Sequence, residues 1–327
     1  MLLHELNDDV LLCIVSEIVL DHRRGTHALF SLALTCRSLS RLACPLIGHH
    51  VSLRVASRRF KLFKRTLSEN PTYGHRVLSF ERSVSEPGYP TLNEAQLKSF
   101  LRKLPNLRTL HSLSATHSGP SVVPILLSRK QPLKHTLEDI ILHDVIVNIV
   151  EVFKLVLFPH LRRLRVETVQ RREIGGQAFS PLSRSGAKSE LEVLELGEYI
   201  GPRATKTILL HCGNSLKELS CPVPVGPHLI DDPPSRDFMI RNFSPMKILS
   251  TLFPVAQTLT KLQLDTTRQD WPGHDGSRLD LSSFVALRSL RASALCFVAP
   301  LSLGISRNGL YRSLPSSLEE FRVSAHL

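Results

Sequence analysis

The residues that could do chemistry are scattered, and few stand at the spacings that catalysis or metal binding requires. Motifs for phosphate binding (G-x-G-x-x-G, the P-loop), zinc hydrolysis (H-E-x-x-H) and a serine nucleophile (G-x-S-x-G) are all missing from the sequence. Two clusters, His49-His50 and Asp270/His274/Asp275, are local, but neither has recognised metal-ligand spacing. We interpret them as strand-edge surface and an exposed turn. The sequence therefore predicts no enzymatic activity, cofactor or metal.

A second set of polar residues is suited to binding another molecule. Several short segments read Leu-x-x-Leu-x-Leu, and the two residues that flank the middle apolar position should share one face of a strand. Their charges are mixed in blocks, whereas a surface that tracks phosphates would be uniformly basic. We therefore expect a protein target and not nucleic acid on this face, with a merely solvated face as the alternative. The candidate target-binding residues are Arg163, Arg165, Glu195, Glu218, Lys261 and Arg291.

The elements that would position these residues recur along most of the chain. Each copy of the apolar pattern predicts a strand, and a degenerate copy begins at His75. The eight clearer copies begin at Leu107, Leu137, Leu161, Leu191, Leu216, Leu259, Leu287 and Leu318. Helices are expected between strands at 93–104, 148–158, 203–212 and 247–253. The proline-rich segment Pro222–Pro245 cannot be regular helix, so it is a predicted exposed loop and an alternative place for recognition.

This series resembles an irregular leucine-rich-repeat array. In that family each strand–helix unit buries its leucines only against neighbouring units. The resemblance implies an α/β solenoid over residues 73–327. Its concave face would be the one that carries the candidate target-binding residues.

Two short apolar helices are predicted near the N-terminus. Val10, Ile14 and Ile18 stand at i, i+4 and i+8 of the first, where Asn7 is a good N-cap. Residues 28–36 form a second apolar stripe, residues 40–47 a third short helix and residues 49–53 a strand. The helical pair is too short to bury its own hydrophobic surface, which indicates a partner.

Residues 4–54 resemble an F-box, and the Pro45-Leu46-Ile47 ending before a Val-x-Leu strand is typical of fungal members. The family's proline and glutamate are replaced by Asn7 and Asp9. The resemblance implies an all-α domain over residues 1–53 that docks on a Skp-type adaptor and, through it, on a cullin–RING ubiquitin ligase. The positions implied to bind the adaptor are Leu6, Asn7, Val10, Leu11, Ile14, Ile18, Leu32, Cys36 and Leu39.

A basic helix over residues 54–72 is expected to join the two parts. Its cations Arg54, Arg58, Lys61 and Arg65 fall on one face, and aromatic residues fall on another. Such a helix can bind anionic membrane or nucleic acid. We interpret it as the solvated face of a helix that packs through its aromatics.

Composition further limits the classes of protein to which this chain can belong. The chain has 327 residues, 42% of them hydrophobic, and a net charge of +12, which favours anionic partners without choosing among them. None of the six cysteines forms a C-x-x-C pair, which suits a reducing compartment. The most apolar stretch, Val145–Phe158, contains Glu151 and Lys154 and is too short to span a bilayer. We expect a soluble protein of the cytoplasm or nucleus.

Three functional hypotheses follow. The first is a substrate-recognition subunit of a Skp–cullin–F-box ubiquitin ligase, in which the N-terminal helices bind the adaptor and the repeats bind a target. The second is a leucine-rich-repeat scaffold whose F-box does not dock, which the substitution at Asn7 keeps open. The third is a basic nucleic-acid-binding module.

Overall fold

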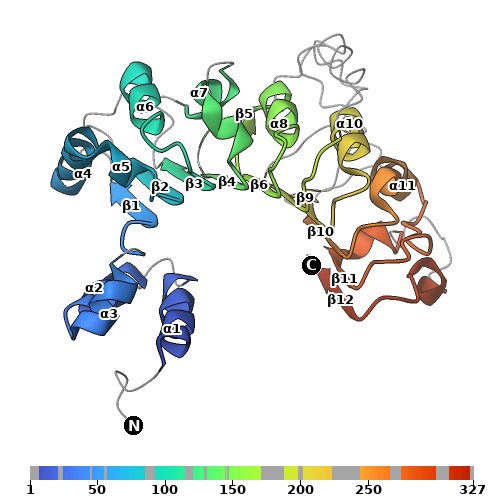
Figure 1. Ribbon diagram of the computed structural model, residues 1–327. Helices are drawn as coiled ribbons and strands as arrows, with labels where there is room; N and C mark the ends of the chain where they lie inside the picture. Colours follow the sequence, from blue (N-terminus) through green and yellow to red (C-terminus); the bar gives the residue numbers. More distant parts are fainter. Residues whose placement is uncertain are drawn as a thin grey trace. The chain divides into compact units, whose positions relative to one another are not determined.

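The computed structural model (Figure 1) divides the chain into two compact units, Met1–Leu137 (unit 1) and Glu138–Leu327 (unit 2). Strands pair in parallel in both units. The described residues are 7–20, 25–44, 46–54, 57–84, 93–114, 121–128, 131–143, 145, 147–170, 188–197, 202–222, 244–265, 274–299 and 309–324.

Unit 1 combines helices with a parallel sheet of strand order β1-β2-β3. Three short helices come first and surround an apolar cluster centred on Val15, Leu29 and Ala43. The Oδ1 of Asn7 accepts from the backbone N–H of Asp9 at 3.1 Å, as an N-cap should. The elements are α1 (Asp8–Leu20), α2 (Gly25–Ala33), α3 (Arg37–Ala43), β1 (His50–Arg54), α4 (Arg58–Glu69), α5 (Pro71–Gly74), β2 (Ser79–Val84), α6 (Glu94–Leu101), β3 (Thr109–Ser114), α7 (Val123–Leu127) and η2 (Pro132–His135).

The predicted fold class, a small all-α domain followed by an α/β solenoid, is wrong. Helices α1–α3 belong to the same compact unit as β1–β3, so the N-terminal region is part of an α/β unit. A short turn makes the connection: Leu46 and Ile47 pack on the helical cluster. The next residue but one, His49, accepts backbone hydrogen bonds from Leu78 and Ser79 at 2.9 and 2.8 Å. One segment therefore serves both the helices and the sheet.

In the described residues of unit 2, parallel strands follow the order β4-β6-β8-β9-β10-β11-β12, and a second small sheet pairs β5 with β7. Helices α8, α10 and α11 lie on the same side of the larger sheet (Figure 1). Its elements are β4 (Asp139–His143), β5 (Val147–Asn148), α8 (Ile149–Val156), β6 (Arg163–Val166), β7 (Val169–Gln170), β8 (Val193–Leu196), α10 (Pro202–Cys212), β9 (Glu218–Pro222), α11 (Pro245–Leu252), η4 (Phe253–Val255), β10 (Lys261–Asp265), β11 (Ser289–Ser293), η5 (Ala294–Cys296), η7 (Leu310–Ser313) and β12 (Glu320–Ser324).

The strands predicted from the apolar pattern are confirmed at every copy, the degenerate one included. Their alternation is also as expected: in β6, Leu164 and Val166 are fully buried, whereas Arg163 and Arg165 face outward. The predicted helices correspond to α6, α8, α10 and α11. The Pro222–Pro245 loop lies mostly outside the described residues.

Side-chain caps fix where two of these helices begin. Asn93 and Asn148 each form a capping box, in which the asparagine accepts from the backbone N–H three residues on and receives a reciprocal bond at its own N–H. These caps satisfy backbone N–H groups in the first turns of α6 and α8 that have no partner within the helix.

Candidate protein-interaction sites

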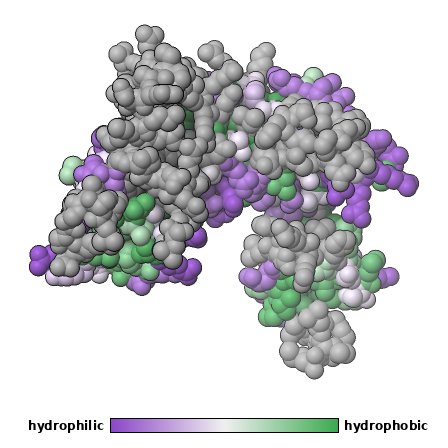
Figure 2. Space-filling model, turned by 180° about the vertical axis from the view of Figure 1, so that it is seen from behind, coloured by the Kyte–Doolittle hydropathy of each residue, from purple (hydrophilic) through white to green (hydrophobic). Residues whose placement is uncertain are grey.

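Helices α1 and α2 expose large apolar side chains, although neither helix is long. Val10 and Leu12 are 46% and 45% exposed, and Phe30 and Leu34 are 51% and 85% exposed. Hydrophobic residues gather over this region in the space-filling view (Figure 2). Exposed apolar patches on small helices are typical of surfaces that bind another protein. We call Val10, Leu12, Phe30 and Leu34 the apolar helix surface.

The residues predicted to bind an adaptor divide into several groups. Asn7 and Val10 are exposed, whereas Leu11 and Leu39 are buried inside unit 1. Ile18 and Leu32 pack on the helical cluster and are partly buried. The others, Ile14 and Cys36, are half-buried, and Leu6 lies outside the described residues.

Sequence reasoning missed Leu12, Phe30 and Leu34. Apolar residues surround α1 almost completely, because Val10, Leu11 and Leu12 are consecutive. A 3.6-residue period therefore allows more than one inward face. The only available signal was the excess of apolar residues over what one face can bury.

The strand face of unit 2 brings four predicted target-binding residues together. Arg165, Glu195, Glu218 and Lys261 come from β6, β8, β9 and β10 and line a hollow of about 500 Å³. Strand register explains the hollow: Glu195 and Gln263 both stand opposite Ser220 on neighbouring strands. A short side chain between longer ones leaves space above it. We call this the strand-face hollow.

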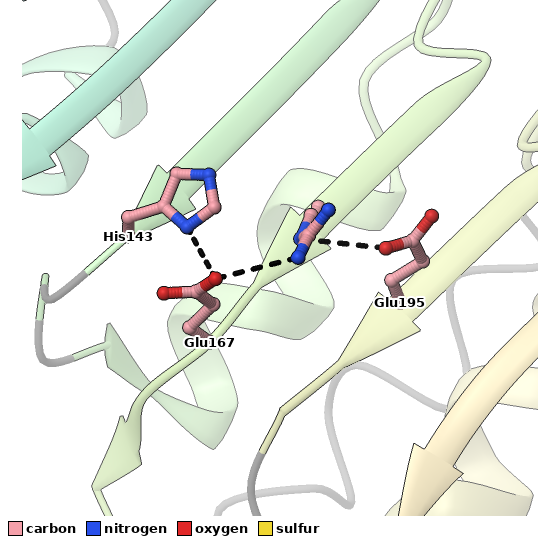
Figure 3. A network of polar contacts seen from close by, with 4 residues as sticks. His143, Glu167 and Glu195 are labelled. Carbon is pink, nitrogen blue, oxygen red and sulfur yellow. Dashed lines mark hydrogen bonds and ion pairs between the residues drawn. The ribbon is translucent and has the colours of Figure 1, made fainter.

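A polar network forms one wall of the strand-face hollow (Figure 3). The Nε of Arg165 lies 3.4 Å from the Oε2 of Glu195, and its Nη2 lies 3.4 Å from the Oε1 of Glu167. His143 pairs with the same Glu167 oxygen through Nδ1. Three successive strands of the larger sheet are therefore linked on one face by polar side chains.

Further ion pairs follow the register of the strands. Asp139 stands opposite Arg163, and their side chains lie 3.1 Å apart. Lys261 stands opposite Glu218, at 3.2 Å. Lys261 and Glu218 are about half exposed, so their pair contributes only about 0–1 kcal/mol and a ligand can rearrange it at little cost. Asp139, in contrast, is only 16% exposed. The remaining predicted residue, Arg291, is exposed on β11.

The described residues show how the two local histidine clusters are held. Within the described ranges no three His, Cys, Asp or Glu side chains are grouped to hold a metal ion. His274 is buried: its Nδ1 accepts from the N–H of Gly276, so Nε2 carries the proton toward the carbonyl of Leu295 at 3.0 Å. Both ring nitrogens are thus used in holding a turn; Asp270 lies outside the described residues. Burial, helped by the charge of Arg76, lowers the pKa of His49.

No family model matches the sequence, and no curated protein is significantly similar to it. In the part of the chain that the structure describes, every helix is too short or too polar to cross a membrane.

Proposed function

We propose that this chain is the substrate-recognition subunit of a Skp–cullin–F-box ubiquitin ligase in the cytoplasm or nucleus. Helices α1 and α2 bind the Skp-type adaptor, and the strand-face hollow binds the target protein. The chain carries out no chemical step. It raises the local concentration of the target near a ubiquitin-loaded enzyme that other subunits supply.

The observation that carries this proposal is the apolar helix surface. Phe30 lies in the last turn of α2, Leu34 is the first residue after that helix, and both are more than half exposed. Leaving them in water is unfavourable by about 1.5–3 kcal/mol each relative to full burial. A partner that covers them recovers this free energy, and the F-box resemblance of the same stretch supports an adaptor as that partner.

Adaptor capture tests the proposal directly. We expect the full chain to retain a purified Skp-type adaptor on a column, and the Phe30→Ser, Leu34→Asp double variant to lose at least 90% of it. A matched control is Leu210→Asp, which changes another exposed leucine, on α10 of unit 2 (61% exposed). Retention of adaptor by both variants would refute the assigned surface. A wild-type chain that never captures the adaptor would instead support the scaffold hypothesis.

Target binding is tested separately. Glu195→Lys removes a wall of the strand-face hollow without touching α1 or α2. We expect proteins that co-purify with the wild type from cross-linked cells to be lost, and adaptor capture to persist. An unchanged set of co-purified proteins would place recognition elsewhere in the chain.

A further inference from the structure

Helix α4 carries charges at the ends where they weaken a helix. Arg58 and Arg59 stand in its first turn, which has no acidic residue, and Glu69 stands at its last position. The helix dipole is positive at the N-terminus and negative at the C-terminus, so both placements oppose it. Ser57 supports the N-terminus instead, because its Oγ accepts from the backbone N–H of Phe60 at 3.1 Å.

Like charges also repeat along the same helix. Lys61 stands three residues from Arg58 and Lys64 and four from Arg65, spacings at which like charges repel. All four side chains and that of Arg59 are exposed, and Arg65 pairs with Glu69 at 3.4 Å. We call Arg58, Arg59, Lys61, Lys64 and Arg65 the basic surface.

Aromatic packing holds α4 in place despite these charges. The ring centroid of Phe100 on α6 lies 5.2 Å from that of Phe60 and 6.0 Å from that of Phe63. Both aromatics of α4 are therefore turned inward, where they cannot insert into a bilayer or stack on bases. The outward side offers cations, with Leu62 as its exposed apolar side chain.

The basic surface lies in a strongly positive part of the chain. Residues 54–108 contain twelve Lys and Arg and four Glu, a net charge of +8 out of +12 for the whole protein. The Nζ of Lys103 also lies at α4, where it donates to the Oγ of Ser68 at 2.8 Å. These placements reduce the stability of α4, so the requirements of folding alone do not account for them.

We propose that the basic surface binds the phosphate backbone of nucleic acid without reading its bases. A duplex carries one negative charge per ~1.7 Å of axis, about twice the density of an extended acidic peptide, so it gains most from five cations on an 18 Å helix. Arginine forks suit phosphate oxygens. This inference is independent of the proposed function, because it uses no residue of the apolar helix surface or the strand-face hollow.

The test is fluorescence anisotropy of the full chain with a labelled 20-base-pair duplex between 50 and 200 mM salt. We expect Arg58→Glu with Arg59→Glu to weaken binding about tenfold or more at 50 mM salt and to reduce the slope of log K against log salt by about 2. The same double variant removes cations from the first turn and adds acids there, so its urea midpoint should equal or exceed that of the wild type.

A control with the same change in net charge is Arg288→Glu with Arg312→Glu, at exposed positions of unit 2. It should keep most of the binding. Equal losses in both double variants would reduce the effect to net charge and overturn the proposal. Displacement of the duplex by polyglutamate at equal charge concentration would also overturn the proposal, because it would assign the surface to an acidic protein. A lowered urea midpoint in the α4 variant would overturn it as well.

Discussion

Gly74 ends helix α5 at a point where the chain passes very close to another segment. A β-carbon at this position would lie 1.9 Å from the carbonyl oxygen of Lys103, which is backbone and cannot rotate away. In an open helix, Gly→Ala stabilises by up to about 1 kcal/mol. Here we expect Gly74→Ala to destabilise by about 2–3 kcal/mol, as overpacked sites do.

Urea unfolding followed by circular dichroism checks this prediction. Ser38→Ala, at an exposed position of α3, is the control and should stay within about 0.5 kcal/mol of the wild type. A Gly74→Ala variant as stable as the control would mean that the two segments separate easily.

The cysteines should differ sharply in reactivity. Burial raises the pKa of Cys212 and of Cys296 to about 12, so neither forms thiolate at pH 8. Cys13 and Cys44 are exposed. We expect a thiol reagent at pH 8 to label Cys13 and Cys44 within minutes, and Cys212 and Cys296 only after unfolding. Mass spectrometry of the labelled peptides measures the extent of labelling at each cysteine. Labelling of Cys212 in the folded protein at the rate of Cys13 would contradict the prediction.

Individual residues also show how much of the burial pattern could be predicted from the sequence. Leu164 and Leu194 were predicted to be buried and are fully buried, because alternation along a strand leaves only two faces to choose between. Leu11 was predicted to contact the adaptor, but its side chain is buried within unit 1. On a helix with apolar residues all round, the inward face is decided by what packs against it, and that information is not local.

At the scale of elements, the capping box stabilises the N-terminus of α8, and a single substitution can remove this stabilisation. Asn148 Oδ1 accepts from the N–H of Glu151 at 2.9 Å, and Glu151 Oε2 accepts from the N–H of Asn148 at 3.0 Å. Asn148→Ala should destabilise by about 1 kcal/mol, because the N–H of Glu151 loses its partner Oδ1. Asn148→Ser keeps a capping oxygen and should recover most of the loss. Equal midpoints for the two variants in chemical unfolding would argue against the cap.

Most elements were predictable, but two relations between them were not. The apolar pattern predicted every strand of the series, whereas the strand-face hollow depends on which residues stand side by side. Glu195 and Gln263 flank Ser220 only because of the register of three strands. The membership of α1–α3 in an α/β unit likewise depends on the turn at Leu46 and Ile47, whose packing no periodicity reveals.

At the scale of the whole molecule, acid should weaken the fold. Hydrogen bonding and attraction to Lys217 lower the pKa of Glu192, and a hydrogen bond from Ser289 lowers that of Glu320. Burial acts to raise the pKa of Asp275, but its hydrogen bonds outweigh this effect and the pKa falls. A lowered folded-state pKa adds stability above the unfolded value, and that stability is lost as pH falls below it.

The expected outcome is a urea midpoint that begins to fall below about pH 6.5, where the unfolded chain protonates His49 more readily than the folded chain, and that falls further below about 4.5, the ordinary value for glutamate. Lys217→Met removes the cation that favours ionised Glu192, so its midpoint should fall less steeply between pH 5 and 3. Parallel curves for the variant and the wild type would show that this pair contributes nothing measurable.

The strand-face hollow has a consequence for how such a protein can change over time. Its walls at Arg165, Glu195, Glu218 and Lys261 come from four different strands, and each is separated from the buried leucines by a single step along its own strand. A substitution at one wall alters one side of the proposed recognition surface and leaves the core as it was. Binding preference can therefore diversify one position at a time while the fold is inherited unchanged.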